Sequence, residues 1–211
     1  MKTLAKSVIA TLLTAVIISS SAVAGSAASP VKSLNPGKST SVKGVVAADG
    51  FNKIWVAGNV KIILTQNVNE GVFVDEDFNA DKTSIIGKGQ TLYINSMEGS
   101  QVTIRVSVKD LQRIEAAGSA EVVTSNNFDV KYLQLFLSQS AKAKVSAITG
   151  SLYTVISDDA VLKMSGAADE HTLIASNIKN VKFNNFVSLK TNGVASDLAM
   201  TANQLTANKA K

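Results

Sequence analysis

The sequence predicts an all-β domain built as a solenoid, with stacked coils of about 19–22 residues each. Three observations predict this fold class: short segments rich in β-branched residues, an approximate repeat in the second half of the chain, and the absence of proline after Pro36. The alternative is an antiparallel β-sandwich, which also has short strands with turn residues every ~8–12 residues. The repeat favours the solenoid.

Short strands are predicted along the body of the chain. The clearest is Val102–Val108, in which valine and isoleucine alternate with Thr103, Arg105 and Ser107. That alternation is typical of a strand with one buried and one solvated face. Similar segments, bounded by Gly, Asn, Asp or Ser, are Val60–Leu64, Gly71–Val74 and Thr91–Ile94. No segment of the body shows a convincing helical period.

Leucines that begin or lie within apolar strands mark the repeat. Leu111, Leu133, Leu152 and Leu173 follow one another at spacings of about 19–22 residues. A small or polar turn and a second short strand come after each of them. A coil of a solenoid buries its inner face only by stacking on its neighbours, and a repeat of this length is typical of such stacking.

Proline is absent from Val45 to Lys211. Because proline lacks a backbone N–H and is confined to the edges and bulges of sheets, its absence suits a fold in which nearly every amide donates to a neighbour. Both prolines, Pro30 and Pro36, lie in a non-periodic segment rich in Ser, Ala, Gly and Lys. We interpret this segment, residues 25–44, as a flexible linker.

The N-terminal segment 1–24 has the three parts of a cleavable secretory signal peptide. Lys2 and Lys6 supply positive charge, Ser7–Ser20 is uncharged and mostly apolar, and Ala22-Val23-Ala24 is a cleavage motif. The apolar run is shorter than the roughly 20 residues of a spanning helix, so we expect cleavage after Ala24. The protein is then periplasmic, surface-associated or extracellular, with no transmembrane segment in the mature chain.

These boundaries divide the chain into four parts. They are a signal peptide at 1–24, the linker at 25–44, a solenoid domain at 45–196, and a C-terminal tail or cap at 197–211. About 187 residues remain after cleavage, which is enough to bury the core of one domain without disulfides.

An ordered set of motifs resembles a known family. The set begins with Phe51-x-x-Ile54-x-Val56-x-Gly58-x-Val60, Leu64-x-Gln66 and Leu92-x-Ile94, and continues with Val102-x-Ile104-x-Val106-x-Val108, Leu111-x-x-Ile114 and Gly118-Ser119-Ala120-x-Val122. This order resembles the DUF2807 family, also called the "putative auto-transporter adhesin, head GIN domain". The resemblance covers roughly residues 45–196. It implies an exported domain with a right-handed β-helix-like fold and an adhesive or structural role, and it brings no catalytic residues.

Composition narrows the classes of function. The formal charge is +5, falls to about +3 without the signal peptide, and is not concentrated in any Lys/Arg block. We therefore expect no nucleic-acid partner. The chain has no cysteine and one histidine, which excludes a disulfide framework and argues against a structural zinc site. No metal and no cofactor are expected.

His171 is the only histidine, and we expect it to be a solvent-exposed turn residue in the polar corner Asp169-Glu170-His171. A Ser-His-Asp triad would have to use it, but no strand–turn–helix nucleophile elbow is present. Acidic clusters at 75–81 and at 158–170 have the oxygen ligands that Ca²⁺ prefers. Neither cluster contains a calcium-loop motif.

The alternative function is a carbohydrate-active β-helix enzyme that uses an acidic corner. Its carboxyl groups would come from Asp158, Asp159, Asp169 and Glu170. Acid–base cleavage of a glycoside needs two carboxyl groups about 5–9 Å apart in a groove. Aromatic platforms usually flank such a groove, but aromatic residues are only 5% of this chain and are scattered along it. We therefore expect no enzyme.

A solenoid presents long regular faces, which suit protein or glycan binding. Lys144, Lys163 and Lys182 recur at equal intervals, each of one predicted coil length, so we expect them to stack in register. Two interpretations are open: charge that keeps a sheet soluble and blunts its edges, or a strip that binds acidic glycan or lipopolysaccharide. These lysines, with Asp158 and Asp159 of the acidic corner, are the candidate binding residues.

The expected function is a non-catalytic adhesin-like or structural module of the cell envelope. Its partner would be an unidentified protein or glycan. Two copies could also pair through the ends of the solenoid, because exposed terminal coils invite pairing unless they are capped.

Overall fold

The computed structural model describes residues 42–46, 50–75 and 79–195, which form thirteen strands and one short 3₁₀ turn. The elements are β1 (Val42–Val46), β2 (Lys53–Gly58), β3 (Val60–Gln66), β4 (Gly71–Asp75), β5 (Thr83–Lys88), β6 (Thr91–Ser96), β7 (Val102–Val108), β8 (Arg113–Ala116), β9 (Glu121–Thr124), β10 (Phe128–Leu137), β11 (Lys142–Ile156), β12 (Val161–Ala175), η1 (Ile178–Asn180) and β13 (Val181–Ala195). The predicted all-β class is confirmed.

Most of the predicted terminal segments lie outside the described residues. These are the signal peptide at 1–24, the linker as far as residue 41, and the tail at 197–211. The first described strand begins at Val42, inside the segment that we expected to be linker. No helix among the described residues is long and apolar enough to cross a membrane.

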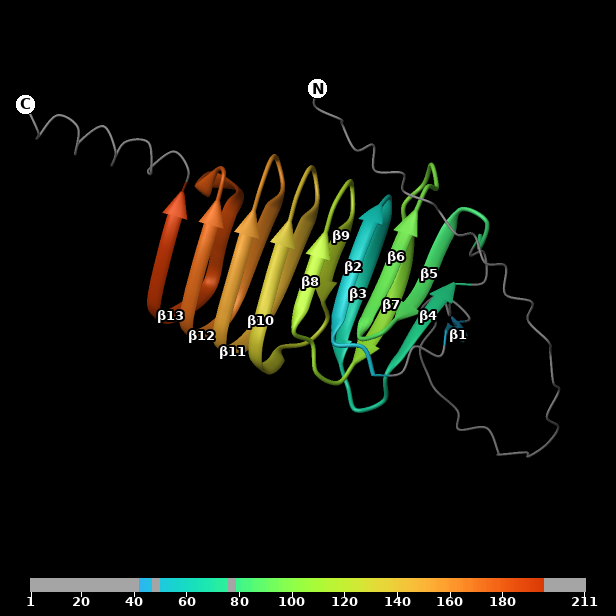
Figure 1. The fold of residues 1–211 in the computed structure, drawn as a ribbon, viewed down its shortest axis with the longest axis horizontal. Coiled ribbons are helices and arrows are strands. Elements are labelled where there is room, and N and C mark those ends of the chain that lie inside the picture. The colour runs from blue at the N-terminus through green and yellow to red at the C-terminus, as the bar shows by residue number, and fades with distance from the viewer. Residues whose placement is uncertain (1–41, 47–49, 76–78, 196–211) are drawn as a thin grey trace, which may run out of the picture. The chain divides into compact units, whose positions relative to one another are not determined.

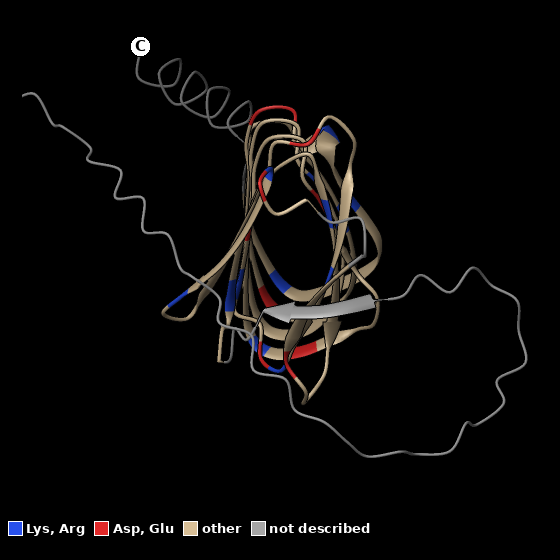
Figure 2. Ribbon diagram, turned by 90° about the vertical axis from the view of Figure 1, so that its right-hand side faces the viewer, with Lys and Arg blue, Asp and Glu red and all other residues tan. Residues whose placement is uncertain are grey.

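The thirteen strands form one sheet that curls back to make two facing walls. The β2 wall contains β5, β6, β2 and β8, and the β3 wall contains β1, β4, β7, β3 and β9. Long strands join the walls towards the C-terminus: β11 pairs with β9 through Lys142–Lys144 and with β10 through Ala147–Ile156. Figure 1 shows β2 and β8 in front of β3 and β9, and Figure 2 shows the two walls end-on.

Most of this pairing is parallel, which is not the pairing of an antiparallel β-sandwich. Parallel partner strands are offset by about one predicted repeat along the chain, as in Gln134↔Arg113 and Leu133↔Leu152. In the described residues, antiparallel pairs are confined to β1–β4, β4–β7 and β5–β6. The marker leucines are in register only for Leu133 and Leu152, because Leu152 then pairs with His171 and not with Leu173.

One apolar core fills the space between the walls. Leu92, Ile54, Ile114 and Leu135 lie in register on four neighbouring strands of the β2 wall, and each is at most 1% exposed. The pleat sends alternate residues inward, so most of the described strands supply at least one such side chain. Complete burial of one of them contributes about 1.5–3 kcal/mol. The residues between them point outward and form the two outer surfaces considered next.

Candidate functional site

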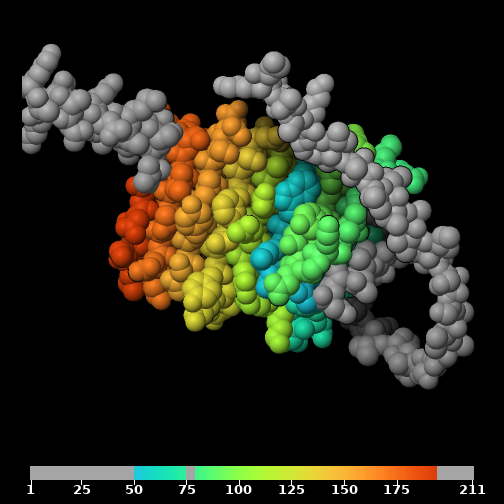
Figure 3. Space-filling model, in the orientation of Figure 1, coloured from blue at the N-terminus to red at the C-terminus, as the bar shows by residue number. Residues whose placement is uncertain are grey.

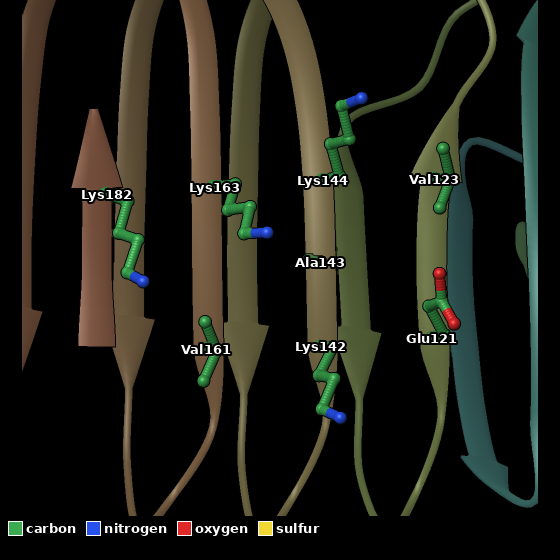
Figure 4. A pocket seen from close by; sticks show the side chains of 8 residues that line it. All are labelled: Glu121, Val123, Lys142, Ala143, Lys144, Val161, Lys163 and Lys182. Atoms are coloured by element: carbon green, nitrogen blue, oxygen red, sulfur yellow. The ribbon is translucent and has the colours of Figure 1, made fainter. Parts of the chain in front are cut away.

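Three lysines form a row on the outer surface of the sheet, where β11, β12 and β13 continue the β3 wall beyond β9. We call Lys144, Lys163 and Lys182 the lysine ladder. Lys144 pairs with Lys163, and Lys163 pairs with Lys182, in the parallel register of β11, β12 and β13. All three side chains are exposed. Figure 4 shows them on neighbouring strands, with Lys142 further along β11. The predicted register of the three lysines is confirmed.

The lysine ladder borders an open depression of about 400 Å³. The depression is lined by Glu121, Val123, Lys142, Ala143, Lys144, Val161, Lys163 and Lys182. Its one carboxylate belongs to Glu121, which is already paired with the Nζ of Lys61 at 2.9 Å. Within the part of the chain that the structure describes, none of the four lining lysines has an ion-pair partner.

Like charges on neighbouring strands oppose folding. Adjacent strands lie ~4.8 Å apart, and like charges directly opposite one another destabilise a sheet by roughly 0.2–1 kcal/mol per pair. The ladder contains two such pairs, Lys144–Lys163 and Lys163–Lys182. An anion bound along the row would offset this repulsion. The arrangement can therefore hold an extended, negatively charged ligand, such as a chain of carboxylates or phosphates.

Asp158 has a structural position at the turn between β11 and β12. Its backbone is left-handed, with a φ of 56°, and its Oδ2 accepts a hydrogen bond from the N–H of Gln139 at 2.9 Å. Gln139 is also left-handed, and its Oε1 accepts from the N–H of Gly118 at 2.6 Å. Hydrogen bonds thus link three turns of the domain, from Asp158 to Gln139 and from Gln139 to Gly118. The Asp158 carboxylate supports the preceding turn, and no ion pair in the described residues joins Asp158 or Asp159 to the lysine ladder.

Replacing Asp158 tests this role. Asp158→Ala should lower the free energy of unfolding by about 1–2 kcal/mol, because it removes the hydrogen bond and places a Cβ residue without a local polar group in left-handed backbone. Asp158→Asn keeps an acceptor oxygen and a side chain that tolerates left-handed backbone, so it should change the free energy of unfolding by less than about 0.5 kcal/mol. Urea unfolding followed by circular dichroism measures both. Equal losses in the two variants would show that the carboxylate charge, and not the turn geometry, matters.

The acidic corner of the alternative enzyme is not assembled. Asp158 and Asp159 lie in the turn before β12, whereas Asp169 and Glu170 lie within β12, beyond Lys163. The Oε1 of Glu170 is 3.7 Å from the Nζ of Lys190 on β13. No group of three or more His, Cys, Asp or Glu side chains that could hold a metal is found among residues 50–74 and 79–193. The side chains of the loop at 75–78 lie outside the described set.

His171 corrects a prediction, because it is buried and not exposed in a turn. It lies in the continuous strand β12, in phase with Leu173 and Ala175, and is 1% exposed. Its Nε2 is 3.3 Å from the Oγ1 of Thr154, and its ring packs edge-on against Phe183 and Phe186. Burial lowers the pKa of His171 below its usual 6.5. The apolar alternation of 171–175 was a signal that the sequence analysis missed.

A row of aromatic side chains on the outer surface of the β2 wall was also missed. Trp55 packs against Tyr93, with ring centroids 6.0 Å apart, and Phe136 packs against Tyr153 at 5.9 Å. The strand β8 lies between the two pairs and places Glu115 beside both Trp55 and Phe136. Figure 3 shows this face of the domain in a space-filling view, where segments of different colour lie in neighbouring bands. The rings come from residues far apart in sequence, so only the pairing of the strands brings them together.

The protein is thus an all-β domain whose candidate binding residues lie on the outer surfaces of its sheet. The chain belongs to the DUF2807 family, described as "Putative auto-transporter adhesin, head GIN domain", whose family model matches residues 50–207. The predicted resemblance is confirmed.

Solved structures of low sequence identity share the fold. A putative adhesin from Bacteroides fragilis has a TM-score of 0.60 and 18% identity, over 76% of this chain and 79% of that one. A putative adhesin from Parabacteroides distasonis has a TM-score of 0.55 and 17% identity, over 72% and 76% of the two chains. No curated protein matches the chain.

Proposed function

We propose that this protein is an exported, non-catalytic, adhesin-like module that binds an acidic glycan of the cell envelope through the lysine ladder. The observation that carries the proposal is the row of Lys144, Lys163 and Lys182, in register and without acidic partners in the described residues. Membership of an adhesin family supports the adhesive role. Export rests on the predicted signal peptide at 1–24.

A solenoid of the right-handed β-helix type is the fold that we propose for the domain. The parallel pairing of successive coils supports it, as does the equal offset between β11, β12 and β13 at the three lysines. In such a fold the lysine ladder runs along the stacking direction, so the row spans two strand spacings, or roughly 10 Å. That length suits successive anionic groups on an extended polysaccharide.

The arrangement of charge favours binding over solubility alone. A surface that is charged only for solubility intersperses both signs and avoids like charges opposite one another. Here the one carboxylate of the depression, on Glu121, is engaged by Lys61. Val123 and Val161 give the depression an apolar part, against which the carbon face of a sugar ring can lie. An extended acidic glycan satisfies both features.

The test is a triple substitution of the ladder, Lys144→Gln, Lys163→Gln and Lys182→Gln. Binding to polygalacturonate, measured by isothermal titration calorimetry at low salt, should weaken at least ~10-fold, because three charge contacts of about 0.5–1 kcal/mol each are lost. Binding by the parent should weaken as salt is raised. The triple variant should also be more stable by about 0.5–1 kcal/mol, since two like-charge pairs are removed. A loss of binding therefore cannot be ascribed to unfolding.

The matched control removes the same charge elsewhere. Lys88, Lys109 and Lys131 are exposed and lie outside the depression. Their triple glutamine variant should bind within about twofold of the parent, because local contacts and not net charge decide the affinity. The proposal fails if the control loses as much affinity as the ladder variant. It also fails if the parent binds polygalacturonate no better than the neutral polymer dextran.

A further inference from the structure

The outer surface of the β2 wall carries a line of apolar side chains that is one residue wide. Strand register places in this line one outward residue from each of seven neighbouring strands, namely Ile86, Tyr93, Trp55, Glu115, Phe136, Val155 and Ile174. All of them except Glu115 are apolar or aromatic, and none is buried. Outward positions of a sheet that faces water are normally polar. The line therefore indicates a binding surface.

The middle of this line is aromatic. Trp55 with Tyr93 and Phe136 with Tyr153 form two ring pairs, and we call these four residues the aromatic row. Only β8 separates β2 from β10, so Trp55 and Phe136 are two strand spacings apart, or roughly 10 Å. One strand spacing is close to the length that a single pyranose adds to an extended glycan. The row thus offers rings at intervals that match successive sugars of one chain.

The tilt of the rings favours a single chain. The planes of Trp55 and Tyr93 are inclined by 47°, and those of Phe136 and Tyr153 by 51°. The flat surface of an insoluble polysaccharide needs coplanar rings, whereas a single chain can twist about its linkages to meet tilted ones. Figure 1 shows β6, β2, β8 and β10 side by side, so the row crosses the wall from strand to strand. An extended chain suits such a course better than a coiled one.

Hydrogen-bonding side chains lie beside the rings. The guanidinium carbon of Arg113 is 4.9 Å from the centre of the Phe136 ring, and its Nε donates to the Oε1 of Gln134 at 2.8 Å. These two contacts hold the guanidinium in place and leave its Nη groups as donors. Glu115 lies between Trp55 and Phe136 and supplies acceptor oxygens. Neither Arg113 nor Glu115 has an ion-pair partner among the described residues.

The charges beside the row favour an uncharged ligand. Arg113 and its register partner Lys53 are positive, whereas Glu115 is negative and lies in the middle of the line. A polyanion laid along the rings would face the Glu115 carboxylate, and like charges there oppose binding. The lysine ladder differs, because its row contains only positive side chains. Sugar hydroxyls satisfy both signs, since a hydroxyl donates to a carboxylate and accepts from a guanidinium.

The width of the line argues against a protein partner. On β2 and β6 the next outward positions are Ala57 and Asn95 on one side of the line, and Lys53 and Thr91 on the other. Neither flank carries a large apolar side chain on these strands. A stable protein interface buries about 800 Å² on each partner around an apolar core. A linear glycan needs only a line of rings with polar groups beside it.

We propose that the aromatic row binds a single, uncharged, extended glycan chain of the cellulose type. The rings of Trp55, Tyr93 and Tyr153 stack against the C–H faces of successive sugars, which the electron-rich face of an aromatic ring attracts. Arg113 and Glu115 bond to the hydroxyls at the rim. This site lies on the other outer surface from the lysine ladder, and it binds its chain whether or not the ladder holds an acidic glycan.

The test uses Trp55, the only tryptophan of the chain, as a fluorescent reporter in the row. Titration with cellohexaose should shift the Trp55 emission to shorter wavelength in a saturable manner, with a dissociation constant of about 1 mM or tighter, because a stacked sugar displaces water from the indole. The α-linked maltohexaose should cause no saturable shift. Tyr93→Ala keeps the reporter and should weaken binding at least ~10-fold, whereas Tyr93→Phe keeps the ring and should bind within about threefold of the parent.

The matched control is Tyr132→Ala, because Tyr132 is 53% exposed on β10 and lies outside the row. It should bind cellohexaose within about twofold of the parent. The triple glutamine variant of the lysine ladder should give the same shift as the parent, so this site and the acidic-glycan site succeed or fail separately. Circular dichroism of each variant establishes that the sheet is folded.

Four results would overturn the proposal. The first two are the absence of a saturable shift with cellohexaose, and a loss of affinity in Tyr132→Ala that equals the loss in Tyr93→Ala. A shift caused by polygalacturonate and not by cellohexaose would assign the row to an acidic glycan. Self-association of the parent that Tyr93→Ala abolishes, seen in analytical ultracentrifugation, would assign it to a second copy of the chain.

Discussion

Replacing Gly58 with alanine is expected to destabilise the domain by more than about 4 kcal/mol, which is among the largest effects of a single substitution. Gly58 has a φ of 82°, and a Cβ built on it would lie 2.9 Å from the carbonyl carbon of Ser96 and closer still to its oxygen. Ser96 is its register partner on β6, so the clash is with a neighbouring strand of the same sheet. A carbonyl oxygen in a ladder cannot move aside as a flexible side chain can. The two strands would have to separate at this point.

Gly50 provides the matched control for this substitution. Its φ of 76° is nearly the same, but nothing lies within 4 Å of the position that a Cβ would take. Gly50→Ala should therefore lower the free energy of unfolding by only about 1–2 kcal/mol, which is the cost of left-handed backbone in a residue with a Cβ. Urea unfolding followed by circular dichroism measures both variants. If the two losses are equal, the close approach of β2 and β6 is not what requires glycine at position 58.

Acidification is expected to weaken the domain through His171. Burial holds the native pKa of His171 below 6.5, so the unfolded chain binds a proton that the folded chain excludes. The neutral His171 makes its full contribution to the free energy of unfolding above the pKa of the unfolded chain, about 6.5. This contribution is lost as pH falls from there to the native pKa, and the free energy of unfolding then changes by at most ~1.4 kcal/mol per pH unit. Nδ1 of His171 is buried and has no hydrogen-bond partner among the described residues, so the doubly protonated ring would have one N–H without an acceptor.

Two variants isolate this effect from the titration of carboxylates. His171→Leu removes the imidazole, so the difference in unfolding free energy between parent and variant should be constant above about pH 7 and change as pH falls below about 6.5. Thr154→Val removes the hydrogen-bond partner but keeps the imidazole, so it should retain the acid dependence of the parent. Denaturant unfolding at several pH values measures each. The same pH dependence in His171→Leu as in the parent would show that His171 does not titrate on unfolding.

Alternation and repeat were sufficient to predict the all-β class and the lysine register. A half-buried strand can be recognised from a short stretch of sequence. Its apolar and polar residues alternate, because one face of the strand packs against the core. The interval between Lys144, Lys163 and Lys182 equals the offset between β11, β12 and β13 at these positions, so counting along the chain placed the three lysines in one row. The leucine markers failed beyond Leu133 and Leu152, because Leu152 pairs with His171, and a bulge between Met164 and Gly166 shifts the register of β12 and β13.

Three features of the site depended on the tertiary structure. Nothing in the sequence indicates a partner for the side chain of Asp158, but its carboxylate accepts a hydrogen bond from the N–H of Gln139 in the turn before β11. His171 stands in a polar stretch, yet the continuous β12 turns it into the core. The aromatic row joins Tyr93 to Trp55 and Tyr153 to Phe136 across strands. In each case the partner lies on a neighbouring strand or turn that is at least 17 residues away in sequence, and strand register decides the contact.

Local alternation and a repeat that can be counted were sufficient to predict the strand-rich class, the family resemblance and the row of three lysines. The structure was needed to find which side chains meet across strands, that His171 is buried, and where a Cβ in place of glycine would clash. Those properties arise from contacts between segments far apart in sequence. Their energies depend on separations at atomic scale, such as the approach of Gly58 to Ser96, which no local pattern encodes.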